Sequence, residues 1–243
     1  MEVMKQCSFA IWLGLSAFVA TSLSFSAEPE DPFAKRGLPP VRDAAFYAKE
    51  AKEEAKNWRG YVKKFLGEPD LEALKSEKGL EVYRFIYRPS FSPHLCLTAR
   101  KVKGQAILQI RRFSHEWKLE LKGSVEMSDD TFAALRGEFA RPEVCDPLRG
   151  MPEPERSDYF SGLDGATWNL ETLRDGKYTR ANIWCPDLFV GNTEAEKASF
   201  KKTHGFDLPD VFPFVQACLE FVRLSGLPLD ASNYAPMPPR PAH

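Results

Sequence analysis

Hydrophobic residues near the N-terminus recur at helical spacing. Between residues 43 and 66 they follow one another at steps of three and four, which predicts an amphipathic helix with Asp43 as its cap. The stripe consists of Ala44, Ala48, Ala51, Ala55, Trp58, Val62 and Phe65. A heptad-like stripe of this kind packs either on the protein's own sheet or on a second helix.

Alternating hydrophobic and polar residues predict four strands after this helix, at 81–88, 94–102, 105–113 and 117–125. A turn at Lys103-Gly104 would pair Leu97 with Ile110 on an apolar face. In the fourth strand, Trp117, Leu119 and Leu121 are expected to face the core. Short connections between consecutive strands favour an antiparallel meander.

Two further helices are expected. Ser128 caps the first, whose buried stripe is Phe132, Leu135 and Phe139. The last helix covers residues 210–225 and is apolar nearly all round. Residues 140–157 and 191–205 are predicted to be loops. The predicted fold is therefore α+β: an antiparallel β-meander sheet with a central Asp-Gly hairpin, covered by the N-terminal amphipathic helix and the apolar C-terminal helix.

The central hairpin lies within residues 162–187 and turns at Asp175-Gly176, a type I′ signal. This turn opposes Glu171 to Arg180 and Thr167 to Trp184, and alternation then separates two faces. The core face carries Trp168, Leu170, Ala181 and Ile183.

The polar face of this hairpin supplies the candidate binding residues, which are Asn169, Glu171, Tyr178, Arg180, Asn182 and Trp184. One interpretation is a half-solvated sheet stabilised by a Glu171–Arg180 salt bridge. The other is a surface for a protein or a small polar ligand, with Tyr178 and Trp184 as anchors.

The hairpin also carries a family resemblance. The segments G-L-D-G-A-T-W-N-L-E, D-G-K-Y and W-C-P-D resemble a motif of uncharacterised exported bacterial proteins, G-x-D-G-x-x-W-x-L-E, D-G-x-Y and W-x-P. The resemblance spans about 26 of the 243 residues. It implies a bacterial source and a fold, but no reaction.

The N-terminus is typical of a signal peptide. Lys5 precedes an apolar stretch from Phe9 to Ala20, and small residues then suit cleavage before or after Ala27. The expected organisation is a signal peptide at 1–26, a linker at 27–42, a single α+β domain at 43–226 and a Pro-rich disordered tail at 227–243. We therefore expect an exported protein, periplasmic or extracellular, with no membrane span after cleavage.

Net charge and cysteine content bear on nucleic-acid binding and on disulfide formation. A net charge of −1 with both signs dispersed gives no footprint for nucleic acid. Export predicts one or two disulfides among Cys96, Cys145, Cys185 and Cys218, with Cys145 bonded to Cys185 or Cys218. Buried free thiols are the competing interpretation.

No recognisable motif for nucleophilic catalysis, phosphate binding, dinucleotide binding or zinc binding occurs, so no catalytic residue, metal or cofactor is assigned. His94 and Cys96 share a strand face, but chance accounts for that pairing better than a dyad. Asp164, Glu171 and Asp187 are candidates for a carboxylate-dependent hydrolase. The sequence leaves enzymatic activity open and favours a non-enzymatic binding or accessory protein of the bacterial envelope over this hydrolase or a helix-mediated structural oligomer.

Overall fold

A computed structural model describes residues 44–90, 93–151 and 165–227. The expected signal peptide, the linker at 27–42 and tail residues 228–243 lie outside these ranges, as does Asp164. No helix within the described residues is long and apolar enough to cross a membrane.

Six antiparallel strands form one sheet in the order β4-β3-β2-β1-β5-β6. Their bounds are Val82–Pro89 (β1), His94–Val102 (β2), Gln105–Phe113 (β3), Leu119–Met127 (β4), Ala166–Arg174 (β5) and Lys177–Trp184 (β6). The first four strands are the predicted meander, and the β5–β6 hairpin is added beside β1. Since β1 is central, nearly all of its residues are buried.

The turn residues set the predicted register. Lys103, Gly104, Asp175 and Gly176 all have positive φ, at 52°, 86°, 52° and 72°. Positive φ at both central positions defines the type I′ turn, whose twist matches that of antiparallel strands. Leu97 consequently lies opposite Ile110, and Glu171 lies opposite Arg180, as expected.

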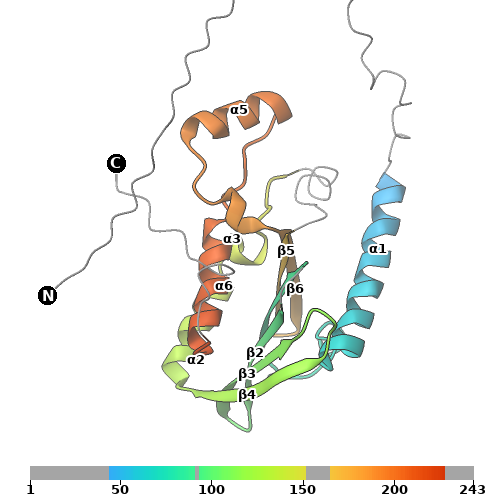
Figure 1. Cartoon of the computed structure of the whole chain (residues 1–243), viewed down its shortest axis with the longest axis vertical. Coiled ribbons are helices and arrows are strands. Elements are labelled where there is room, and N and C mark those ends of the chain that lie inside the picture. Colours follow the sequence, from blue (N-terminus) through green and yellow to red (C-terminus); the bar gives the residue numbers. More distant parts are fainter. Residues whose placement is uncertain (1–43, 91–92, 152–164, 228–243) are drawn as a thin grey trace, which may run out of the picture. The chain divides into compact units, whose positions relative to one another are not determined.

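Helices cover both faces of the sheet (Figure 1). On one face lie α1 (Ala44–Tyr61) and a π-helical turn, η1 (Val62–Leu66). On the other lie α2 (Asp129–Phe139), α3 (Pro142–Cys145) and α6 (Phe212–Leu224). The predicted α+β architecture is therefore confirmed.

The larger core lies between the sheet and α2, α3 and α6. Tyr83 and Phe85 from β1 are buried in it, and the Tyr83 and Phe139 rings lie 5.3 Å apart. Phe139 also contacts Phe221 of α6, at 5.1 Å. Ser128 caps α2 by accepting a hydrogen bond from the Thr131 amide, as its position before two carboxylates predicts.

Two expectations about buried residues were wrong. Phe65 is 39% exposed and Leu66 is 2% exposed, so the buried stripe of the first helix continues from Val62 to Leu66. Because the π turn is wider than an α turn, a step of three from Val62 to Phe65 leaves the buried side, whereas a step of four to Leu66 returns to it. Leu119 and Leu121 are not buried in the core either. They are 52% and 38% exposed because β4 is the outer strand, beyond the helices.

Neither predicted loop is a loop throughout: Pro142–Cys145 form α3 within residues 140–157, and Glu194–His204 form helix α5 within residues 191–205. Thr193 accepts a hydrogen bond from the Glu196 amide, while the Glu196 carboxylate accepts one from the Thr193 amide. This capping box is a sequence signal for a helix start. It stands in the printed sequence as T-E-A-E, so the helix was predictable. A short 3-10 turn, η2 (Pro186–Phe189), lies between the end of β6 and the start of α5.

Candidate functional site: the sheet face beneath α1

Alternation along the strands selects the side chains that face α1, and cross-strand pairing aligns them in rows. One row contains Thr98, Arg84, Glu171 and Arg180, and the next contains Cys96, Ile86, Asn169 and Asn182. A third row contains Arg88, Thr167 and Trp184. We call this surface the α1 face. It includes most of the predicted binding residues.

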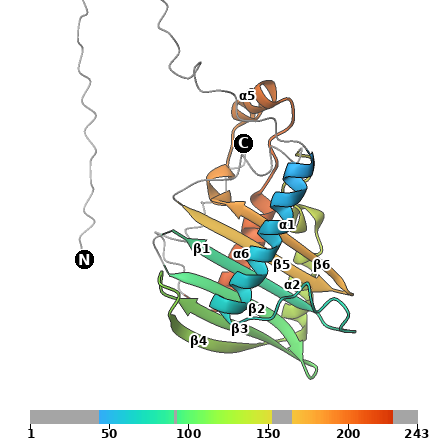
Figure 2. The same cartoon turned by 90° about the vertical axis from the view of Figure 1, so that its right-hand side faces the viewer.

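Helix α1 and η1 cross the α1 face diagonally (Figure 2). Near one end, Glu54 pairs with Arg180 on β6 and accepts a hydrogen bond from Asn182 at 3.3 Å. At the other end, the Arg111 guanidinium on β3 donates to the carbonyls of Leu66 and Gly67, at 2.6 and 3.1 Å. Arg111 thus satisfies carbonyls that a helix end leaves without partners. Gly67 ends the helix in the left-handed conformation, with φ at 60°.

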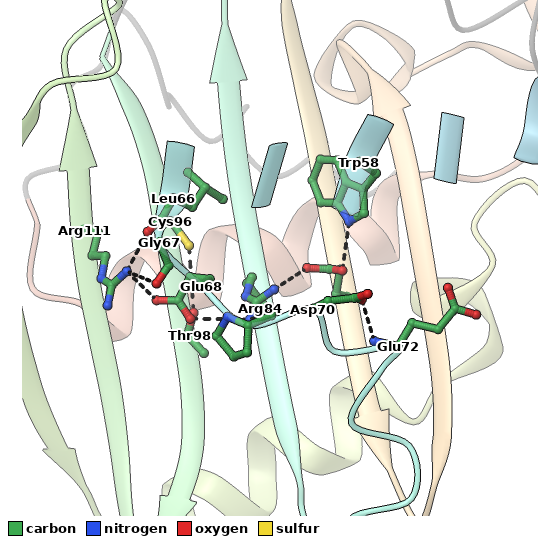
Figure 3. A network of polar contacts seen from close by, with 12 residues as sticks. Trp58, Leu66, Gly67, Glu68, Asp70, Glu72, Arg84, Cys96, Thr98 and Arg111 are labelled. Carbon is green, nitrogen blue, oxygen red and sulfur yellow. Dashed lines mark hydrogen bonds and ion pairs between the residues drawn. The ribbon is translucent and has the colours of Figure 1, made fainter. Parts of the chain in front are cut away.

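A buried charge network lies at the centre of this crossing, formed by Glu68, Arg84, Arg111 and Glu171. Arg84 Nη1 lies 2.9 Å from Glu171 Oε2, and Arg84 Nη2 lies 3.4 Å from Glu68 Oε2. Figure 3 shows Glu68 between Arg84 and Arg111, and Arg111 Nη1 lies 3.0 Å from Glu68 Oε1. Two guanidinium groups therefore balance two carboxylates. Burial alone would lower the pKa of Arg84, but the charges of Glu171 and Glu68, the hydrogen bond to Glu171 and the neighbouring Cys96 together raise that pKa.

Neutral donors complete the hydrogen bonding of Glu171. Trp58 Nε1 donates to Glu171 Oε1 at 2.9 Å, and the Tyr178 hydroxyl donates to the same oxygen at 2.8 Å. Burial, together with the Glu171 charge, raises the pKa of Tyr178 and keeps the phenol protonated. Removing one partner of such a network leaves a buried charge, at a cost of about 3–5 kcal/mol. Glu171 thus holds α1 on the sheet.

The expected exposure of the hairpin's polar face was therefore wrong for Asn169 and Glu171. Asn169 and Glu171 are each 1% exposed because α1 covers this side of the sheet. The expected Glu171–Arg180 salt bridge is replaced, since Glu171 pairs with Arg84 and Arg180 pairs with Glu54. Tyr178 is half-buried beside Glu171. The predicted anchors Tyr178 and Trp184 thus lie on different rows of the sheet.

Next to the network lies a set of polar side chains that each have a buried atom without a hydrogen-bond partner among the described residues. We call Tyr61, Arg88, His94 and Asn169 the unpaired polar cluster. Eight buried side-chain atoms have no hydrogen-bond partner among the described residues, and five of them belong to this cluster. They are Tyr61 Oη, Arg88 Nε, His94 Nδ1, and both Nδ2 and Oδ1 of Asn169. Buried polar atoms are ordinarily paired with protein or water, so these five atoms require water or a ligand as their partner.

Aromatic contacts hold this cluster together. The Arg88 guanidinium lies over the Tyr61 ring, 4.5 Å from its centroid. His94 stacks on Trp117 with centroids 3.5 Å apart, and Trp117 in turn meets the edge of Tyr61 at 4.9 Å. Asn169 lies opposite Ile86, and Ile86 is two residues along β1 from Arg88. Asn169 is therefore a diagonal neighbour of Arg88.

The electrostatics of the cluster are set by burial and by Arg88. No carboxylate pairs with Arg88 among the described residues, although the side chain is only half-exposed. Burial lowers the pKa of His94, a hydrogen bond involving the His115 backbone opposes this shift, and the charge of Arg88 adds to the lowering. The cluster is thus positively charged and rich in donors. Beside it, Asn182 is exposed and Trp184 is half-exposed.

The predicted disulfides are absent, because all four described cysteines are free. Cys96 packs beneath α1 with Trp58 and Val62, whereas Cys218 is buried in the core on the opposite face of the sheet. Cys145 Sγ donates to the Phe139 carbonyl at 2.6 Å, and Cys185 Sγ accepts from the Ala166 amide at 3.1 Å. The sheet itself separates Cys96 from Cys218.

The structure brings few of the other candidate groups together. Thr167, the partner of Trp184, lies four residues along β5 from Glu171. At strand spacing this is a separation of about 13 Å. Asp187 comes three residues after Trp184, outside the β5–β6 ladder, so no strand pairing brings it beside Glu171 as a carboxylate pair. Burial raises the pKa of Asp187. His94 stacks on Trp117 rather than contacting Cys96. No group of three metal-ligating residues occurs within the described ranges.

Sequence reasoning missed Arg84, Arg88, Glu68 and Trp58 as members of this site. The signal was the alternation in β1, which places Arg84 and Arg88 on one face with Val82 and Ile86. Charged residues among aliphatics in a central strand predict a buried partner, because an unpaired buried charge is costly. Nothing in the spacing identified Glu171 as that partner.

No protein-family model, curated protein or solved structure matches this chain.

Proposed function

We propose that this protein is an exported, non-enzymatic binding protein of the bacterial envelope, and that it binds a small anionic ligand at the unpaired polar cluster. The observation that carries the proposal is Asn169. Its side chain is 1% exposed, yet neither its amide nitrogen nor its carbonyl oxygen has a partner among the described residues. Glu171, two residues along the same strand, is paired on both of its oxygens.

The chemistry of the cluster favours an anion. Arg88 provides only donors and has no carboxylate partner in the described chain, while Tyr61 and Asn169 can add a hydroxyl and an amide donor. A guanidinium binds carboxylate or phosphate oxygens in a two-pronged geometry. Asn169 Oδ1 can accept from an ammonium or hydroxyl group on the same ligand. A small molecule with a carboxylate or phosphate and one such donor fits this set.

In this proposal the ligand reaches the cluster from solvent past Asn182 and Trp184. Asn182 is exposed directly opposite Asn169, and Trp184 is half-exposed one row further along. Glu54 already engages Arg180 and Asn182, so ligand entry on that side would involve the first helix. The predicted binding residues Asn169, Asn182 and Trp184 therefore remain in the proposal. Glu171 and Tyr178 serve to hold the fold.

The test is a titration of the mature protein with inorganic phosphate, citrate and glutamate, followed by amide and indole shifts in NMR spectra. Saturable shifts of the Asn169 and Asn182 side chains and of the Trp184 indole are expected with one of these probes. Arg88→Gln should abolish them, whereas Arg112→Gln, which removes a surface arginine paired with Glu120, should not. No saturable shift with any probe would overturn the proposed site, as would a response that survives Arg88→Gln.

Export is tested separately. Expression of the full chain in a Gram-negative host should give a mature protein that starts at Ala27 or at the following residue, recovered from the periplasm or the medium. Retention of the uncleaved chain in the cytoplasm would contradict the export part of the proposal and leave the binding site untouched.

A further inference from the structure

The outer strand β4 has an unusual surface. It pairs with β3 along one edge, and no strand pairs with its other edge within the described ranges. Eight of its nine residues are exposed. It also carries three of the six large hydrophobic residues that are exposed in the described chain, namely Leu119, Leu121 and Val125. Figure 2 shows β4 at the rim of the sheet, beyond the crossing of α1.

Part of this strand continues the apolar face of the main core. Val125 lies opposite Leu108, and Met127 lies opposite Ala106. Leu108 and Ala106 are buried beneath the helices, and Met127 packs against the same core. Leu121 is on this side as well, because it alternates with Val125. The core face of the sheet therefore extends past the last helix as an uncovered strip.

We infer that β4 pairs with β4 of a second copy of this chain, antiparallel and centred on Ser124, and so joins the two sheets into one. An open strand edge offers unpaired amide and carbonyl groups to such a partner. Centring on Ser124 places Lys122 opposite Glu126 of the other copy, and the two-fold axis repeats this pair. Leu121 then lies opposite Met127, and Gly123 lies opposite Val125. The exposed strips of both copies become continuous.

The charge pattern distinguishes this register from its neighbours. Centring on Gly123 would pair all nine residues but would place Glu120 opposite Glu126 twice, which is repulsive. Centring on Leu121 would pair only five residues of β4. The Ser124 register pairs seven residues and leaves no like charges opposed. The second copy is thus the occupant to which this edge is complementary in both charge and hydrophobic pattern.

The experiment measures the mass of the mature protein in solution by sedimentation velocity over a range of concentrations. The wild type is expected to dimerise reversibly. Lys122→Glu and Glu126→Lys should each raise the dimer dissociation constant by about tenfold or more, because two attractive pairs become repulsive. Both side chains are exposed, so both variants should retain the wild-type circular dichroism spectrum.

The decisive experiments combine the two charge reversals, either by mixing the single variants or by placing both substitutions in one chain. An equimolar mixture of the two single variants should form a heterodimer, because positions 122 and 126 of opposite copies would then carry opposite charges in both pairs. The double variant Lys122→Glu/Glu126→Lys should dimerise as the wild type does. A wild type that stays monomeric at every concentration overturns the inference. A dimer that ignores the single reversals also overturns it, because its interface then lies elsewhere.

Discussion

The indole of Trp58 donates a hydrogen bond to the Glu171 carboxylate at 2.9 Å, across 113 residues of sequence. This contact joins the N-terminal helix to the middle of the central hairpin. Glu171 is also the partner of Arg84, so the helix and the buried ion pair depend on the same carboxylate. Moving α1 off the sheet would therefore remove a donor from a buried charge as well as expose apolar area.

Trp58→Phe tests this contact. The substitution keeps an aromatic ring but removes the donor, so the free energy of unfolding should fall by about 1.5–3 kcal/mol, as for hydrogen bonds to charged groups. Urea denaturation measures the change. Tyr61→Phe is the matched control on the same helix, because its hydroxyl has no partner among the described residues, and it should be nearly neutral. Equal effects of the two substitutions would refute a stabilising bond to Glu171.

Arg84→Met tests the buried charge network. It leaves the Glu171 carboxylate without its cation, so we expect a loss of about 3–5 kcal/mol. The double variant Arg84→Met/Glu171→Gln should recover most of this loss. Glutamine is neutral and its carbonyl still accepts from Trp58 and Tyr178, while Glu68 remains paired with Arg111. Losses that simply add in the double variant would show that Arg84 and Glu171 do not interact.

Gly165→Ala tests the tight approach of β5 to the end of β6. A Cβ at Gly165 would lie 2.4 Å from Cys185 Sγ and 2.9 Å from the Trp184 ring, at a φ of +143°. We expect a loss of several kcal/mol in thermal or chemical unfolding, from overpacking and backbone strain together. Gly137→Ala is the control, since a Cβ there meets nothing within 4 Å. It should stabilise helix α2 by about 0.5–1 kcal/mol.

The elements that depend on local signals were predictable from the sequence. Asp175-Gly176 determined the hairpin register, and Ser128 identified the start of α2. Alternation in β1 also places Tyr83 and Phe85 on the same face, which is buried in the main core. These features depend on backbone conformation and on a period of two residues, so a short window of sequence contains them.

The candidate site depends on contacts between distant segments, and for this reason it was misread. Polar residues on one face of the hairpin look solvated until a second element covers them. Here that element is α1, whose Trp58 is 113 residues from Glu171. The same limit explains Leu119 and Leu121, since only the strand order shows that β4 is outermost. The sequence reveals which residues share a face, and tertiary packing decides whether that face is buried.

The four cysteines should behave as separate thiols. Thiol titration of an unfolded protein expressed from Ala27 onwards, without reductant, should find four reactive groups, because Cys96, Cys145, Cys185 and Cys218 are all free. In the folded protein, Cys96 should react very slowly, since burial raises the pKa of its thiol to about 12. Burial also raises the pKa of Cys218 well above its usual value. Fewer than four thiols after unfolding would instead support the disulfides expected of an exported chain.

His94 should make stability depend on pH between its unfolded and folded pKa values. Burial lowers the folded pKa of His94 below its ordinary value of 6.5, so the unfolded chain takes up this proton first as pH falls. The contribution of His94 is therefore complete above about pH 6.5 and is lost as pH falls towards the lower folded pKa. His94→Phe keeps an aromatic ring against Trp117 but cannot take up a proton. We would follow its unfolding free energy by urea denaturation from about pH 7.5 to about pH 5. This free energy should decline less steeply with falling pH than that of the wild type. The two slopes should differ by the equivalent of up to one bound proton per molecule. If the two slopes coincide, His94 takes up its proton equally in both states, and burial beside Arg88 does not control its charge.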